Sequence, residues 1–179
     1  MSTTGGLTAG NAARINGGME HLWAPWRIRY ILAPKEETGC FVCRKAQSAD
    51  DVGNHVLLRD KTCFALLNTY PYNAGHLMVA PYKHTGTWDD LADQELADLM
   101  LLARRCQQLL QRVMKPEGYN VGINFGRAAG AGVEDHLHLH IVPRWNGDTN
   151  YMPVLGDVRV IPQALDELCH TLRTALNQP

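Results

Sequence analysis

The stretch Glu134–Trp145, EDHLHLHIVPRW, contains three histidines at alternate positions with leucines between them. Such alternation of apolar and polar residues is typical of a half-buried β-strand, whose side chains point to opposite faces in turn. The leucines then face the core, and His136, His138 and His140 share the other face, about 6.6 to 6.8 Å apart. One substrate with several phosphates, or a metal beside a phosphate, could meet all three. A purification tag or a solvated edge strand is the alternative, but tags are contiguous and terminal, whereas this run is internal and patterned.

The composition is that of an ordinary globular chain. Its 179 residues, 45% of them hydrophobic, suffice for one well-buried core and are too few for two ordinary domains. A formal net charge of −1 argues against a broad surface for duplex nucleic acid or an anionic membrane. The sequence shows no membrane-spanning run and no signal-peptide pattern, so we expect a cytoplasmic protein. Five cysteines with one close pair do not resemble a disulfide framework.

The amino-terminal region differs from the rest of the chain. Residues 1–18 are small, polar and glycine-rich, which predicts a flexible tail, and Met19 is a candidate start of the natural chain. Residues 19–179 are expected to form a single domain. Order should begin at HLWAPWRIRYI, residues 21–31, although spacing alone gives this segment no role.

Beyond residue 40, short β-prone runs alternate with turn residues. The expected strands are residues 55–59, 62–67, 76–81, 120–125 and 137–142. A hairpin at Asp60-Lys61 joins the first two. Apolar residues spaced three to five apart predict one long amphipathic helix over residues 88–114, and a last helix is expected over residues 162–176. This order predicts an α+β fold, an antiparallel sheet with one long helix and a C-terminal helix.

Three segments together resemble one known family. HLHLHIV resembles the His-x-His-x-His-x-x motif of the histidine triad family of nucleotide hydrolases and transferases. LLNTYPYNAGHLMVAPYKH resembles the family's nucleoside-binding strand, loop and strand, and NFGRAAGAGVEDHLHLHIVPRW resembles its phosphate-binding segment. Within the family, WAPWR, GRAAGAG and VPRWNGDTNY resemble most the bacterial diadenosine tetraphosphate phosphorylases.

The resemblance implies covalent chemistry at the middle histidine. In the family, the residue that matches His138 attacks the α-phosphorus of a nucleotide, which splits one difficult displacement into two. An imidazole that is mostly neutral near pH 7 suits this role. His140 is expected to donate hydrogen bonds to non-bridging phosphate oxygens or to help the leaving group. The alternative for either residue is a satisfied core histidine.

The resemblance also assigns the nucleotide pocket. Asn68 matches the Asn or Asp that binds the ribose hydroxyls in the family, although a strand-end turn residue is the alternative. Asn124 matches an amide that contacts phosphate. Arg144 is a further candidate for phosphate binding, and Trp145 could stack on a base, line the phosphate pocket or simply pack.

The loop before the triad departs from the commoner family pattern. Elsewhere Ala-Gly-Gln-Ser/Thr precedes the triad, whereas AGAGVED is one residue longer from Asn124 and contains no Gln, Ser or Thr. Backbone N–H groups near Ala131 and Gly132 would have to replace the missing hydroxyl. The freed space could admit a second phosphate-bearing reactant, with Arg127 and Arg144 as further donors, which favours phosphorolysis over hydrolysis.

The close pair Cys40 and Cys43, in GCFVC, is open to several interpretations. A thioredoxin-like redox dithiol would need a strand before the pair and a helix after it, and the surrounding sequence does not show that setting. A structural zinc would need two more Cys or His ligands. Two buried thiols without a metal are the third interpretation.

The resemblance supplies the missing ligands. In zinc-bearing histidine triad proteins and related uridylyltransferases, the two remaining ligands match His84 and His136. His55 or His76 could replace His84, since their sequence positions permit it. The triad then divides its work, with His136 holding zinc, His138 attacking and His140 contacting phosphate.

The sequence as a whole predicts a homodimeric nucleotide-processing enzyme. The resemblance implies that the long helix and a sheet edge pair across a two-fold axis. The expected reaction cleaves a dinucleoside polyphosphate such as diadenosine tetraphosphate and passes the nucleotidyl group to phosphate or water, with magnesium as a candidate companion of the polyphosphate. The alternatives are a nucleoside phosphoramidate or general nucleotide hydrolase and, from another class, a non-catalytic zinc-stabilised module that binds nucleotide or RNA.

Overall fold

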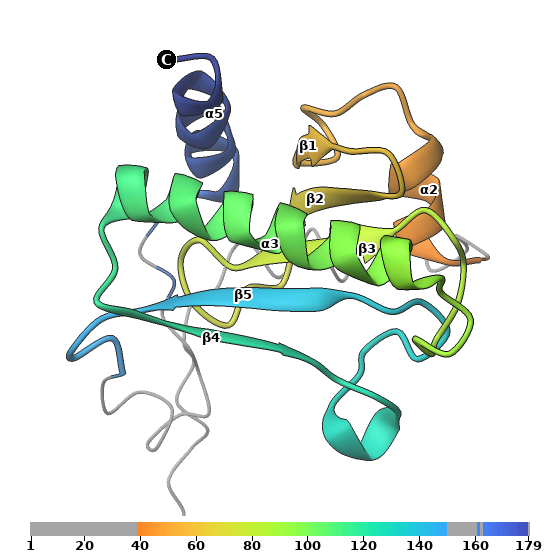
Figure 1. The fold of residues 1–179 in the computed structure, drawn as a ribbon. Helices are drawn as coiled ribbons and strands as arrows, with labels where there is room; N and C mark the ends of the chain where they lie inside the picture. Colours follow the sequence, from red (N-terminus) through yellow and green to blue (C-terminus); the bar gives the residue numbers. More distant parts are fainter. Residues whose placement is uncertain (1–38, 150–160, 162, 179) are drawn as a thin grey trace, which may run out of the picture. The chain divides into compact units, whose positions relative to one another are not determined.

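The computed structural model describes residues 39–149, 161 and 163–178 (Figure 1). In chain order its elements are α2 (Phe41–Gln47), β1 (Val56–Arg59), β2 (Cys63–Leu67), β3 (Leu77–Pro81), α3 (Asp93–Met114), β4 (Gly118–Ile123), the 3₁₀ turn η1 (Arg127–Ala129), β5 (Leu139–Arg144) and α5 (Leu165–Leu176). The tail predicted for residues 1–18 and the segment 21–31 lie outside the described residues.

The five strands of the described region form one sheet in the order β1-β2-β3-β5-β4, and all neighbours are antiparallel. This confirms the predicted α+β class. The hairpin between β1 and β2 turns at Asp60-Lys61, as predicted, and each predicted strand is present with its ends shifted by a few residues. β5 begins at Leu139, so His136 and His138 lie in the segment that leads into the strand.

The long helix begins later than its sequence pattern indicated. Residues 88–91 form a turn in which the Leu91 N–H donates to the Trp88 carbonyl, and α3 begins at Asp93. The Ala92 N–H donates to the Glu95 carboxylate, which satisfies one of the donors left open at a helix start. Among the described helices, none combines the length and the hydropathy that crossing a membrane would require.

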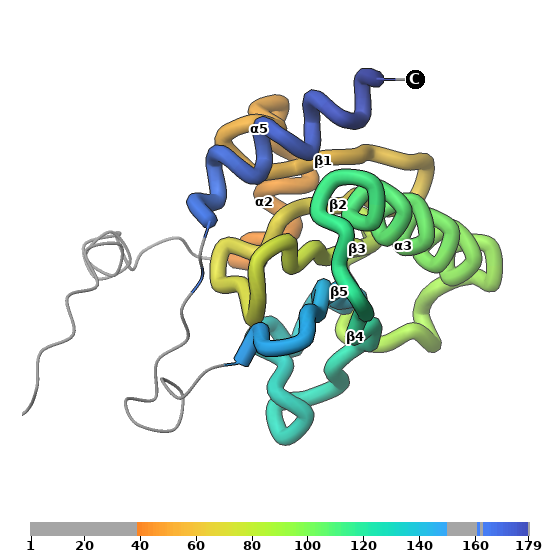
Figure 2. The backbone as a smooth tube through the Cα atoms, turned by 90° about the vertical axis from the view of Figure 1, so that its left-hand side faces the viewer, coloured from red at the N-terminus to blue at the C-terminus, as the bar shows by residue number. Residues whose placement is uncertain are grey.

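Two apolar clusters lie on opposite faces of the sheet. On one face, α3 packs its buried stripe against the strands, in a cluster that includes Leu137, Leu139 and Ile141, as predicted for the leucines between the histidines. On the other face, Val42 of α2 packs with Phe64 and neighbouring strand residues. Figure 2 shows α3 and α2 on the two sides of the strands. The first cluster therefore joins both α3 and α5, through Leu168, Cys169 and Leu172, to the sheet, and the second joins α2 to the other face.

The strand register decides where the last histidine of the triad lies. His140 pairs with Met78 on one side and with Gly122 on the other. Directly paired residues of antiparallel strands point to the same face, and Met78 belongs to the α2-side cluster. The imidazole of His140 therefore lies on the face opposite α3, and Gly122 puts no side chain over it.

Candidate active site and metal centre

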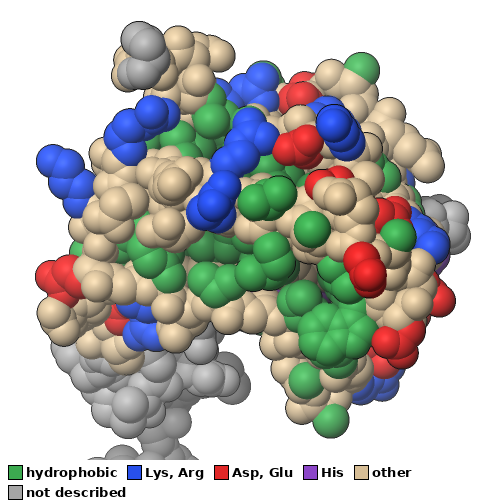
Figure 3. Space-filling model, in the orientation of Figure 1, with side chains coloured by type: hydrophobic (Ala, Val, Ile, Leu, Met, Phe, Trp, Pro, Cys, Tyr) green, Lys and Arg blue, Asp and Glu red, His purple; other side chains and the backbone are tan. Residues whose placement is uncertain are grey.

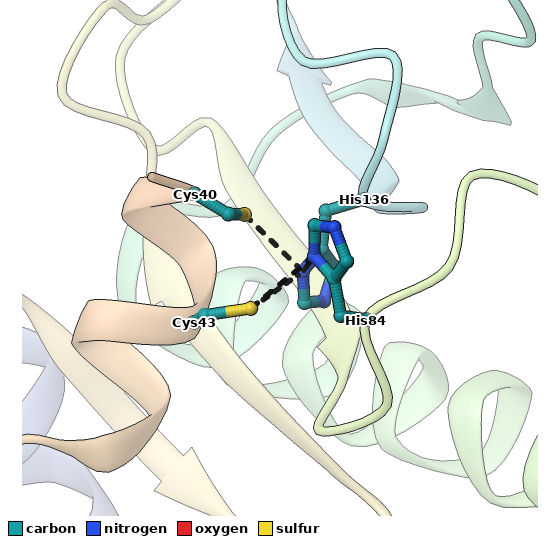
Figure 4. A group of neighbouring side chains, drawn as sticks. All are labelled: Cys40, Cys43, His84 and His136. Atoms are coloured by element: carbon teal, nitrogen blue, oxygen red, sulfur yellow. Dashed lines mark hydrogen bonds between the residues drawn. The ribbon is translucent and has the colours of Figure 1, made fainter. Parts of the chain in front are cut away.

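Two cysteines and two histidines converge at the start of α2 (Figure 4). The ligand atoms of Cys40, Cys43, His84 and His136 all lie within 4.8 Å of one another. Nδ1 of His136 lies 3.3 Å from Sγ of Cys40, 3.4 Å from Sγ of Cys43 and 3.3 Å from Nδ1 of His84. Four ligands around a tetrahedral zinc, at about 2.0 to 2.3 Å, are separated by about 3.3 to 3.8 Å. This donor set can therefore hold such an ion.

The local fold presents both thiols from one short helix. Cys40 is the N-cap of α2 and Cys43 lies in its first turn, while the buried Val42 anchors the helix to the sheet. The cysteine pair was expected to lack the preceding strand and following helix of a redox dithiol; the helix α2 is present, so that half of the expectation was wrong, and the residues before Gly39 lie outside the described range. A helix alone does not decide between a redox dithiol and a metal site, but two histidine nitrogens beside the sulfurs favour a metal.

The other two histidines weighed as metal ligands lie elsewhere. Nε2 of His55 lies 2.7 Å from a carboxylate oxygen of Asp166 at the start of α5. His76 is fully buried and lies 2.9 Å from His140. Of the histidines considered at the fourth position, only His84 joins the cluster of the described region.

His136 is oriented by the backbone. Its Nε2–H donates to the Pro81 carbonyl at 2.9 Å, which leaves the lone pair on Nδ1 directed at the cysteine sulfurs. Burial lowers the pKa of His136, and burial raises the pKa of the Cys43 thiol. A neutral imidazole with a fixed tautomer is the form that ligates a metal. A metal cation bound by these residues would favour the thiolate form of the cysteines.

His138 has the tautomer that a nucleophile requires. Its side chain is 7% exposed, and its Nδ1–H donates to the carbonyl of His136 at 2.8 Å. The lone pair of the neutral ring must then lie on Nε2. A fixed lone pair at a nearly buried position can attack an electrophile that enters from the open side.

His140 is prepared as a hydrogen-bond donor through a chain of contacts. Nδ1 of His76 accepts from the Tyr72 N–H at 3.0 Å and faces the Asn68 amide at 3.3 Å, so its proton lies on Nε2. That Nε2–H donates to Nδ1 of His140 at 2.9 Å. His140 then carries its proton on Nε2, a buried atom without a hydrogen-bond partner among the described residues.

Burial keeps this pair of histidines uncharged. Burial, reinforced by the neighbouring histidines, lowers the pKa of His76 to about 3 and that of His140 to about 4. Both rings are therefore neutral near pH 7. The ring of His140 packs edge-on against that of His138 with 4.7 Å between centroids, so the donor ring and the ring with the free lone pair are neighbours.

The loop before the triad is shaped by two glycines. Gly126 and Gly130 adopt positive φ angles of 73° and 87°, which other residues rarely do. The Ala131 N–H, expected to contact phosphate, donates instead to the Gly126 carbonyl at 3.3 Å. Gly132 is exposed, and its N–H has no hydrogen-bond partner within the described region. Asn124 is half-buried where the loop leaves β4.

Two predicted phosphate ligands lie at the other end of β5. Arg144 is six residues beyond His138, a separation of about 20 Å along an extended strand. Its Nε and Nη2 atoms donate to Asp148 at 2.6 and 2.9 Å, and Nη1 donates to Asn120 at 2.7 Å. The Trp145 N–H also donates to Asp148. The structure therefore does not bring Arg144 and Trp145 to the histidines.

The sequence did not identify His76 and Tyr72 as site residues. His76 had been considered only as a metal ligand, and Tyr72 had no role. The run NAGH shows that a histidine immediately precedes β3, but contact with His140 depends on a cross-strand register that local sequence does not encode.

The HIT domain family model matches residues 50–147, more than half of the chain. The chain belongs to the HIT domain family. This HIT protein is 39% identical over 163 residues to AP-4-A phosphorylase of Mycobacterium tuberculosis, which covers 87% of this chain and 84% of that protein. It is 37% identical over 97 residues to the asymmetrical bis(5'-nucleosyl)-tetraphosphatase of Schizosaccharomyces pombe, which covers 54% of this chain and 53% of that protein.

The fold of this HIT protein is also similar to solved structures. The crystal structure of a zinc-bound histidine triad family protein from Mycobacterium smegmatis superposes with a TM-score of 0.60 at 29% identity, covering 77% of this chain and 93% of that chain.

Proposed function

We propose that this HIT protein cleaves dinucleoside polyphosphates, with diadenosine tetraphosphate as substrate, by nucleotidyl transfer through His138. One observation carries the proposal: the ring of His138, whose lone pair is on Nε2, packs against the ring of His140, whose buried Nε2–H has no hydrogen-bond partner among the described residues. The identity to AP-4-A phosphorylase over most of both chains supports the substrate class.

In the first step, Nε2 of His138 attacks the α-phosphorus of one nucleotide. The N–P bond forms, the bond to the bridging oxygen breaks, and the electron pair leaves with a nucleoside triphosphate anion. The Nδ1–H bond to the His136 carbonyl stabilises the positive charge that develops on the ring. His140 would donate to a phosphate oxygen, and Asn68, which matches the ribose-binding Asn or Asp of the family, would bind the ribose.

In the second step, an acceptor oxygen attacks the same phosphorus and the N–P bond breaks, so the lone pair returns to Nε2. Phosphate as the acceptor gives ADP, and water gives AMP. We propose phosphate, held by the Gly132 N–H and by Arg127. The Arg127 side chain is 90% exposed and pairs with Glu134 at 2.9 Å. Exposed ion pairs are weak, so an incoming anion can replace that carboxylate.

We propose zinc as the ion of the Cys and His cluster, held by Cys40, Cys43, His84 and His136. Bound there, it would supply structural cross-linking between α2 and the segment that carries His138. Magnesium would enter with the polyphosphate, because the Cys and His donor set does not suit an ion that prefers oxygen ligands. The five free thiols favour a reducing compartment, the cytoplasm.

We also propose a homodimer formed through α3 and the free edge of β4. Met100 and Leu101 on α3 are 58% and 47% exposed, and Val121 on β4 is 52% exposed. Hydrophobic side chains gather over α3 and toward β4 in Figure 3. β4 is an edge strand of the described sheet, so a two-fold partner would cover apolar surface and pair its open backbone groups.

The test is product analysis with diadenosine tetraphosphate, with and without millimolar phosphate. We expect ADP and ATP when phosphate is present. AMP formed at the same rate at every phosphate concentration would exclude phosphorolysis and leave hydrolysis. Adenosine 5'-phosphoramidate, tested in parallel, addresses the phosphoramidase alternative, and nucleotide binding without any turnover would support a non-catalytic module.

A further inference from the structure

The rings of Tyr72, His76 and the last triad histidine, His140, pack together. The ring of Tyr72 lies 4.7 Å from that of His76 and 5.7 Å from that of His140, tilted by 33° from each. The two imidazoles are themselves 5.0 Å apart. Tyr72 lies in the loop between β2 and β3, so a residue outside the triad covers the histidine pair.

The backbone of Tyr72 acts on the same pair. Its N–H donates to Nδ1 of His76 at 3.0 Å, which requires that nitrogen to be unprotonated. The proton of His76 then lies on Nε2 and is donated to His140. One residue therefore contacts both histidines with its ring and sets the direction of their hydrogen bond with its backbone.

We propose that Tyr72 is a positioning residue, which holds His140 in the tautomer that donates from Nε2. The proposal rests on the function above, in which that donor contacts a phosphate oxygen. Tyr72 would act through His140 and need not touch the reacting atoms.

The physical reason is the exclusion of water from the pair. Besides Tyr72 itself, the titratable groups that face His140 are His76, immediately before β3, and His138, from the segment before β5. Protonation of His140 at Nδ1 would set two N–H groups against each other and break the bond to His76. The ring of Tyr72 reduces solvation of the cation, and burial is the main reason that the pKa of His140 falls to about 4.

The experiment is a histidine NMR titration of the resting protein, in wild type, Tyr72→Phe and Tyr72→Ala. In wild type and Tyr72→Phe, we expect His140 to titrate near pH 4 and to show a proton on Nε2 at neutral pH. In Tyr72→Ala, its midpoint should move toward the ordinary value of about 6.5. The kcat/KM for diadenosine tetraphosphate should fall about tenfold, as expected for the loss of an aromatic contact, and Phe should restore it.

Tyr70→Ala, in the same loop, is the matched control and should leave the His140 titration unchanged. If Tyr72→Ala does not fold, Tyr72→Gln keeps much of the bulk without the ring and should shift the midpoint in the same direction. The proposal would be overturned if His140 titrated at the wild-type midpoint in a folded variant without the ring. It would also be overturned if Tyr72→Phe shifted the midpoint as much as Tyr72→Ala. The titration needs no substrate. If the wild-type protein titrates as expected but does not cleave diadenosine tetraphosphate, the proposed function is wrong and the role of Tyr72 in positioning His140 still stands.

Discussion

The carbonyl of His136 accepts a hydrogen bond from Nδ1 of His138 at 2.8 Å. The same His136 directs its own Nδ1 at the sulfurs of Cys40 and Cys43. One residue thus joins the Cys and His cluster to the ring proposed to attack phosphorus. A change that displaces His136 therefore weakens the hydrogen bond that keeps the lone pair of His138 on Nε2.

The purified protein should contain about one zinc per chain, and Cys40→Ser or Cys43→Ser should lower both metal content and thermal stability. Loss of a metal that joins two segments removes folding free energy, so we expect the melting temperature to drop by about 10 °C. Metal analysis and thermal melting of the same samples measure both effects.

His136→Ala should lose zinc as the cysteine variants do. Cys169→Ala is the matched control, because that thiol is buried in α5 away from the cluster and its removal should leave the metal content unchanged. Metal-free wild-type protein whose melting does not respond to added zinc would contradict the zinc assignment.

Arg144→Gln should reduce stability near neutral pH without changing the ratio of ADP to AMP. The Arg144 guanidinium holds the pKa of the Asp148 carboxyl well below its usual range. Such a carboxylate stabilises the fold above its unfolded-state pKa of about 3.9, and this stabilisation is lost as the pH falls toward the lower folded-state value. The stability gap between wild type and variant should therefore shrink between pH 7 and about pH 3 in urea unfolding.

Arg127→Gln is the matched comparison. The exposed ion pair of Arg127 with Glu134 should contribute little to stability at neutral or acidic pH. Arg127→Gln should instead need more phosphate to form ADP. A stability gap for Arg144→Gln that does not change with pH, or a changed product ratio in that variant, would show that Arg144 has a role other than holding Asp148.

Val121→Asp and Leu101→Asp should convert the dimer to monomers. A carboxylate at the centre of an apolar interface would have to be desolvated against its partner copy, which opposes association. Light scattering after size exclusion gives the mass directly. Val52→Asp, at another exposed apolar position, should stay dimeric, and a monomeric wild type would exclude this interface.

The sequence predicted what depends on local pattern. The alternation in HLHLHIV indicated a strand with leucines toward the core, and Leu137 and Leu139 lie there. The spacing of apolar residues indicated α3, although the predicted helix began five residues too early. The helix α2 was missed because it has only seven residues, and a pattern that short does not distinguish a helix from a loop.

Contacts between distant segments could not be predicted from local pattern. The bond between His76 and His140 joins residues 64 positions apart and depends on the register of β3 against β5. Arg144 was assigned to phosphate because it follows the triad in sequence, yet an extended strand carries it away from His138. The cluster at Cys40 was predicted only through family resemblance, because spacing alone left several histidines open.

The most direct test of the central claim is to locate the covalent intermediate. The protein is mixed with diadenosine tetraphosphate without phosphate, quenched without acid, and mapped by peptide mass spectrometry. We predict an adenylyl adduct on His138. His138→Asn should show none and should lose turnover by about a thousandfold or more while it still binds nucleotide, and His170→Asn, altered on the exposed side of α5, should behave as wild type. An adduct on another residue, or near-normal turnover in His138→Asn, would contradict the account.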